Sequence, residues 1–106
     1  DVAIAIDHSA FDRSHLEFRA GDTVRFVIHN SDPIDHELII GDTGVQAHHE
    51  EGTEPRHGAV PGEVSVPSGT TRTTTYTFEE PGRLLFGCHL PGHYRYGMKG
   101  SITITP

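Results

Sequence analysis

Apolar and polar residues alternate along short stretches of this chain, which is the pattern of β-strands with one buried face. The alternation is clear at 2–6, 16–18, 24–29, 71–78 and 99–105, and shorter apolar runs occur at 36–40, 64–66 and 84–86. Gly, Pro, Asn and Asp separate these stretches at close intervals. The pattern predicts an all-β fold, a Greek-key β-sandwich of about seven or eight strands.

Two connections are less regular. The strands on either side of Gly21-Asp22 form either a hairpin or a corner at which the chain changes sheets. Residues 41–61 show no strand pattern and predict a long loop with a short helix, roughly 44–51. Thr43 and Gln46 fit a capping box at the start of this helix, and Gly52 fits its end.

Composition narrows the class of protein. With 106 residues, of which 34% are hydrophobic, the chain fits one domain, 1–106. The net charge of −7 argues against nucleic acid as a partner, and no apolar run is long enough to span a membrane. Because the chain begins at Asp1 without Met or an apolar segment, we expect a trimmed, extracytoplasmic protein, periplasmic or secreted, whose targeting segment is absent.

Residues 86–98 contain the densest group of possible metal ligands. This stretch contains the only cysteine, Cys88, and the only methionine, Met98, with His93 between them and four residues on each side of it. A thiolate, an imidazole and a thioether are soft donors that suit copper in both oxidation states. His36, at the entrance of an apolar strand, is the best candidate for a further ligand, whereas His29 lies opposite an apolar face and is expected to point to solvent.

These residues carry a resemblance to the cupredoxins, the blue-copper family that includes plastocyanin, azurin and rusticyanin. The stretch 20–26 resembles a strand entry of the family, and Asn30 followed by His36 resembles its Asn and first copper histidine. Cys88-x4-His93-x4-Met98 is similar to the ligand loop of rusticyanin-like members. The resemblance implies one type 1 copper per chain, with His36, Cys88 and His93 as trigonal ligands and Met98 as a weak axial one. It also implies a non-enzymatic protein that transfers single electrons through Cu(I) and Cu(II).

Two features depart from that pattern. Glu37 stands where a small or amide side chain is common in the family, and its carboxylate is expected to lower the reduction potential or make it pH-dependent. His89 directly follows Cys88, as in multicopper oxidases, but the chain lacks the paired histidines of a trinuclear cluster. We therefore expect His89 to be a surface side chain or to support the site without binding the metal.

Four alternatives stay open at this point. In the first, the chain is a copper-handling module whose delivery arm is the histidine-rich insertion 46–58, with His48, His49 and His57 binding a second metal. In the second, it is one domain of a larger copper oxidoreductase. Cys88 is an unligated core cysteine beside surface histidines, or Cys88 and His93 form a nucleophilic pair. The last is disfavoured because no third residue orients the base and because it leaves Met98 unexplained.

A protein that transfers electrons needs a redox partner to dock with it. We expect a redox protein to dock at the His93 edge, where an apolar patch of Leu90, Pro91 and Tyr94 supports weak, fast-exchanging contacts. Arg95 and Lys99 favour an acidic rim on that partner. We expect the chain itself to be a monomer.

Overall fold

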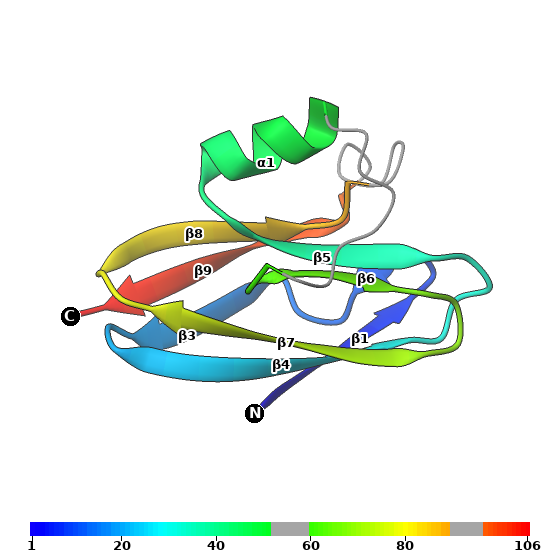
Figure 1. Ribbon diagram of the computed structural model, residues 1–106, viewed down its shortest axis with the longest axis horizontal. Coiled ribbons are helices and arrows are strands. Elements are labelled where there is room, and N and C mark those ends of the chain that lie inside the picture. Colours follow the sequence, from blue (N-terminus) through cyan, green and yellow to red (C-terminus); the bar gives the residue numbers. More distant parts are fainter. Residues whose placement is uncertain (52–59, 90–96) are drawn as a thin grey trace.

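Two β-sheets packed face to face form the body of the molecule in the computed structural model, which describes residues 1–51, 60–89 and 97–106 (Figure 1). The first sheet has the strand order β2-β1-β4-β7. Its strands are β1 (Val2–Asp7), β2 (Ala10–Phe11), β4 (Asp22–Asn30) and β7 (Thr71–Phe78). The second sheet has the order β3-β9-β8-β5-β6. Its strands are β3 (His15–Arg19), β5 (His36–Gly41), β6 (Glu63–Val66), β8 (Gly82–Gly87) and β9 (Lys99–Thr105).

Both sheets mix strand directions. In the first, β1 runs parallel to β4, and β4 runs antiparallel to β7. In the second, β3 runs parallel to β9, and the remaining pairs are antiparallel. The all-β sandwich predicted from the alternation is confirmed. The described residues form nine strands rather than seven or eight, because the additional strand β2 has only two residues, too few to show an alternation.

The core lies between the sheets and consists of the apolar residues of each alternation. In β4, Val24, Phe26 and Ile28 are buried while His29 is exposed, as predicted. In β5 all six residues are buried. A strand buried on both faces requires a cover on its outer side, and α1 (Thr43–Glu51) supplies it by lying across β5 and β8 (Figure 1).

The connection from β3 to β4 is a corner between sheets, so the hairpin alternative is wrong. Ala20 donates its backbone N–H to Thr105 O of the second sheet at 2.8 Å, and Gly21 donates to Phe78 O of the first sheet at 2.6 Å. Gly21 has φ 96°, a left-handed conformation that glycine adopts without a Cβ clash. Two adjacent residues thus bond to opposite layers of the sandwich.

Helix α1 begins one residue earlier than the predicted capping box requires. Asp42 is its N-cap, since Asp42 Oδ1 accepts the Val45 N–H at 2.9 Å and Asp42 O accepts the Gln46 N–H at 3.1 Å. The capping box at Thr43 and Gln46 is therefore wrong: the Gln46 side chain points away from the cap and into the protein. The predicted helix end at Gly52 lies outside the described residues.

Candidate metal centre

His36 is the first residue of β5, and the preceding loop is tied down by Asn30, the last residue of β4. The Asn30 side chain is fully buried; its Nδ2 donates to Ile34 O and Val66 O, both at 2.9 Å, and its Oδ1 accepts the Asp32 N–H at 2.9 Å. These bonds fix the chain just before His36. His36 is only 1% exposed and alternates onto the core face of β5 with Leu38 and Ile40.

Cys88 and Met98 stand at the two ends of the predicted ligand loop. Cys88 directly follows β8 and Met98 directly precedes β9, two strands that pair antiparallel with Gly87 opposite Lys99. The Cys88 N–H donates to Met98 O at 3.1 Å, which extends this pairing by one rung. Both side chains are buried in the same core cluster. Gly97 has φ 103°, and it forms a turn directly before Met98.

The sandwich brings His36 and Cys88 together across 52 positions of sequence. His36 Nδ1 lies 4.0 Å from Cys88 Sγ in a buried environment. The other ring nitrogen, Nε2, lies 2.7 Å from Asp32 Oδ2. Because a carboxylate only accepts, the neutral imidazole carries its proton on Nε2 and turns the Nδ1 lone pair towards the sulfur. His36 is thus oriented as a ligand for an ion beside Cys88.

Asp32 is a buried carboxylate that is not among the predicted site residues. Besides the His36 ring, it accepts the backbone N–H groups of His8 at 2.6 Å and Ser9 at 2.7 Å. Burial alone would raise the pKa of Asp32, but the hydrogen bonds from Ser9, His36 and His8 outweigh burial and hold that pKa below its ordinary value. The carboxylate is therefore ionised at neutral pH. A sequence signal existed in the spacing of Asp32 and His36, but His8 and Ser9 reach the site only through the fold.

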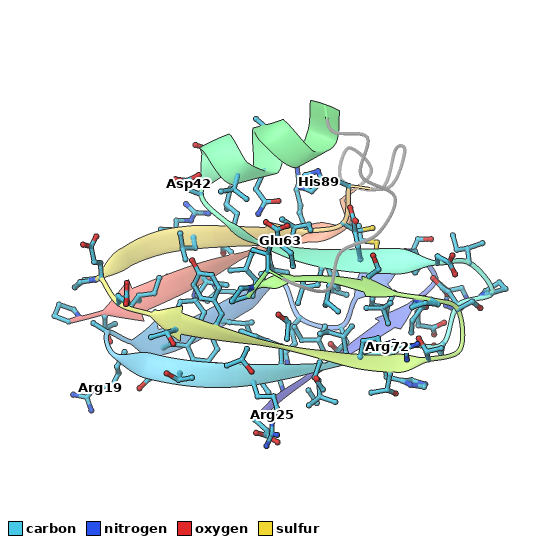
Figure 2. The ribbon with its side chains drawn as sticks, viewed as in Figure 1. Arg19, Arg25, Asp42, Glu63, Arg72 and His89 are labelled. Atoms are coloured by element: carbon cyan, nitrogen blue, oxygen red, sulfur yellow. The ribbon has the colours of Figure 1, made fainter. Side chains whose placement is uncertain are left out.

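His89, the residue after Cys88, is held by two buried side chains. Its backbone N–H donates to Glu37 Oε1 at 2.8 Å, and its ring Nε2 donates to Gln46 Oε1 of α1. Gln46 in turn donates from Nε2 to Ile39 O at 3.1 Å and Leu85 O at 3.2 Å. Figure 2 shows His89 beneath α1. His89 was expected to be either a surface side chain or a residue that supports the site. It is a supporting residue, because it is only 9% exposed and anchors the end of β8 to the helix.

Glu37, the residue that departs from the family pattern, is buried beside the backbone of the predicted ligand loop. Its side chain is 3% exposed and lies on the outer side of β5, since it alternates with the core-facing His36 and Leu38. Its carboxylate supports the backbone immediately after Cys88. Glu37, Gln46 and His89 together join β5, α1 and the end of β8, and we call these three residues the brace.

Several predicted residues fall outside the described part of the chain. His93 does, as do Leu90, Pro91, Tyr94 and Arg95 of the expected docking patch and His57 of the insertion. The side chains of His48 and His49 are likewise not described. Within the described residues, no three His, Cys, Asp or Glu side chains group to hold a metal, so His36 and Cys88 stand as a pair.

The donors that are described fit copper. A thiol sulfur, an imidazole nitrogen with its lone pair turned inward and a buried thioether form the soft set expected of a blue-copper site. Typical bonds of a comparable metal, zinc, are about 2.0 Å to nitrogen and about 2.3 Å to sulfur. The 4.0 Å between His36 Nδ1 and Cys88 Sγ is slightly less than the sum of such bonds, so both atoms would lie within bonding reach of a single copper ion.

Comparisons with known proteins agree with this chemistry. The copper-binding proteins of the plastocyanin/azurin family match residues 1–105. The chain therefore belongs to this family, the cupredoxins, and binds one copper.

The chain is similar to several copper proteins in sequence and in structure. The copper-resistant cuproprotein CopI of Rubrivivax gelatinosus is 35% identical over 101 residues, a match that covers 92% of this chain and 61% of that protein. Auracyanin-B of Chloroflexus aurantiacus is 29% identical and matches all of this chain and 52% of its own length. The reduced auracyanin of Roseiflexus castenholzii has a TM-score of 0.83 at 27% identity, covering 99% of this chain and 96% of that one. Rusticyanin, at 17% identity and a TM-score of 0.73, shares the fold.

Proposed function

We propose that this chain is a one-electron carrier whose copper is held by His36, Cys88, His93 and Met98. His36, Cys88 and His93 are the trigonal ligands in this assignment, and Met98 is the weak axial ligand. The observation that carries the proposal is the buried approach of His36 Nδ1 to Cys88 Sγ at 4.0 Å, with Met98 in the same core cluster. Copper bound by such donors exchanges single electrons between Cu(I) and Cu(II).

The protein's own residues keep the donors in place through both oxidation states. His36 is held by β5, Asn30 and Asp32, and the Cys88 end of β8 is held by the bond to Met98 O and by the brace. Donors on strand ends that are hydrogen-bonded on several sides move little when the metal charge changes. A small rearrangement means a small energetic barrier to electron transfer.

The partner, the oligomeric state and the location of the protein are also part of the proposal. A redox protein docks at the His93 edge, and the chain works as a non-enzymatic monomer outside the cytoplasm. The relative CopI, named a copper-resistant cuproprotein, supports a copper-related role, and the dithionite-reduced auracyanin of Roseiflexus castenholzii supports a redox role. No helix in the described part of the chain is long and apolar enough to cross a membrane.

A second candidate function is copper handling, because two of the matched relatives are named copper-resistant cuproproteins. The chain spans 61% of the Rubrivivax protein, so a role within a longer polypeptide is also consistent with the match. In this case the chain releases copper to an acceptor instead of retaining it. The histidine-rich insertion 46–58 is the proposed second binding site.

Reconstitution with Cu(II) tests the first proposal. An electron carrier gives an intense thiolate charge-transfer band and narrow copper hyperfine splitting in electron paramagnetic resonance, at one copper per chain. A colourless protein overturns it.

Repeated cycles of reduction and oxidation in the presence of a Cu(I) chelator separate the two candidate functions, since an electron carrier keeps its copper and a copper donor loses it. A second equivalent of Cu(II) or Zn²⁺ bound after the first supports the insertion as a metal site.

A further inference from the structure

Asp32 connects a strained turn to the predicted copper ligand His36. The turn joins β1 and β2, which pair Ile6 with Phe11 and Asp7 with Ala10, so His8 and Ser9 are its two central residues. Their φ angles are 53° and 55°, as in a type I′ turn, where Asn-Gly is the preferred pair. A positive φ is uncommon for any residue other than glycine, and two in succession make this turn a conformationally costly one.

The strained turn donates two hydrogen bonds to one carboxylate. The backbone N–H groups of His8 and Ser9 both point at Asp32, at 2.6 and 2.7 Å. Asp32 is 6% exposed, and the His36 ring nitrogen Nε2 lies 2.7 Å from its Oδ2. The Asp32 backbone is held as well, because its N–H donates to Asn30 Oδ1 and its O accepts the Ser68 hydroxyl at 2.6 Å. Five hydrogen bonds thus fix an anionic group behind one imidazole.

We propose that Asp32 is a positioning residue of the copper centre that orients His36 and lowers the reduction potential. The inference rests on the proposed ligand role of His36. A carboxylate that accepts the outer N–H of a metal-bound imidazole fixes the tautomer and makes the ligand a stronger base. The oxidised ion carries one more positive charge than the reduced ion, so a buried anion nearby stabilises Cu(II) more than Cu(I).

The burial of Asp32 determines how strongly its charge lowers the reduction potential of the copper. A carboxylate in water is screened by solvent and salt, whereas one enclosed by protein acts through a lower effective dielectric. Asp35, in the same loop and directly before His36, is exposed, and its Oδ1 accepts the Ser68 N–H at 2.9 Å. The two aspartates differ chiefly in burial and in contact with His36. Asp35→Asn is therefore a matched control for Asp32→Asn.

The first experiment measures the reduction potentials of the copper-loaded wild type, Asp32→Asn and Asp35→Asn by equilibrium titration with redox mediators. Asp32→Asn is expected to shift the Cu(II)/Cu(I) equilibrium at least tenfold towards Cu(I), which is about 59 mV for a one-electron couple. Asp35→Asn is expected to shift it less than threefold. Equal shifts in the two variants overturn the proposal.

A second measurement needs neither copper nor a substitution. Nitrogen-15 NMR of the histidine rings in the metal-free wild type is expected to show His36 protonated on Nε2, with a slowly exchanging proton. Protonation on Nδ1 overturns the positioning role. If the wild type forms no intense charge-transfer band, the proposed function fails, while the NMR result still decides how Asp32 orients His36. If the band forms and the two variants have equal potentials, only the inference about Asp32 fails.

Discussion

His89 donates its ring N–H to Gln46 Oε1, so the residue that follows Cys88 is bonded to the helix of the long insertion. The same Gln46 side chain donates to Ile39 O of β5 and Leu85 O of β8. One amide therefore joins α1 to both strands that carry the described donors His36 and Cys88. The insertion has a structural role at the metal centre through Gln46, whether or not its histidines bind metal.

Replacing Gln46 with Leu keeps most of the side-chain volume but removes every polar contact of the brace that passes through the helix. The carbonyls of Ile39 and Leu85 each lose one donor and the ring N–H of His89 loses its acceptor, and an unsatisfied buried group costs about 1–3 kcal/mol. We expect Gln46→Leu to lower the free energy of unfolding by roughly 2–4 kcal/mol, measured by denaturant titration of the metal-free protein. Substitution of the exposed Ala47 by Ser is the control. A loss no larger than that of the control contradicts the brace.

The N-cap assignment is tested by two neighbouring substitutions. Asp42→Ala removes the acceptor of the Val45 N–H and is expected to cost about 0.5–2 kcal/mol of stability. Thr43→Ala removes a side chain with no role in the cap and is expected to cost less than about 0.5 kcal/mol. Thermal and denaturant unfolding measure both. The capping box predicted from sequence would reverse this order.

The proposed ligands differ in what their loss does to the spectrum. Cys88→Ser removes the thiolate, so we expect the intense charge-transfer band to disappear. Met98→Ala removes only the weak axial donor, so copper is expected to stay bound while the reduction potential changes. Optical titration with Cu(II) and potentiometry measure these outcomes. A Met98→Ala protein with an unchanged potential would remove Met98 from the ligand set.

Acid stability of the metal-free protein depends on Asp32, because its pKa is lower in the folded state than its ordinary value. Above the ordinary value Asp32 is ionised both folded and unfolded, and its stabilising contribution is complete. As the pH falls, the unfolded chain binds the proton first, and the contribution is lost as the pH passes through the lowered folded pKa. The difference in unfolding free energy between wild type and Asp32→Asn should be constant above about pH 5 and shrink below about pH 4. A difference that grows on acidification would contradict this sign.

Charge reversal tests the docking edge. Lys99, exposed at the start of β9, and Arg95 in the predicted loop are expected to attract an acidic rim on the redox partner. Reversing both charges should slow association on the order of tenfold at low salt. The absorption spectrum should barely change, because neither side chain is a proposed ligand. Stopped-flow electron transfer at several salt concentrations measures the rate, and an unaffected rate places docking elsewhere.

Much of the fold could be predicted because alternation reports burial directly. The strands at Val24, Phe26 and Ile28 and at Ile102 and Ile104 bury the residues that the pattern selects. The corner at Ala20-Gly21 could not be distinguished from a hairpin, because both use the same turn residues and only the choice of sheet differs. Strand β2 was missed because two residues are too few to show a period.

For the metal centre, the residue types and spacing of Cys88, His93 and Met98 were enough to predict copper, and the family match confirms the metal. The ligand set stays a prediction. The supporting residues were out of reach, because Asp32 draws its donors from His8 and Ser9 of another strand pair, and Gln46 meets His89 across 43 positions of sequence.

The sequence by itself determined the sandwich and the soft donor set, because burial patterns and donor chemistry are properties of local residues. Only the tertiary structure decided which groups surround those donors. It placed His36 Nδ1 beside Cys88 Sγ, an anion behind His36 and a helix above His89. The physical reason is that hydrogen bonds between distant segments depend on how the two sheets and α1 pack, and no local pattern records that packing.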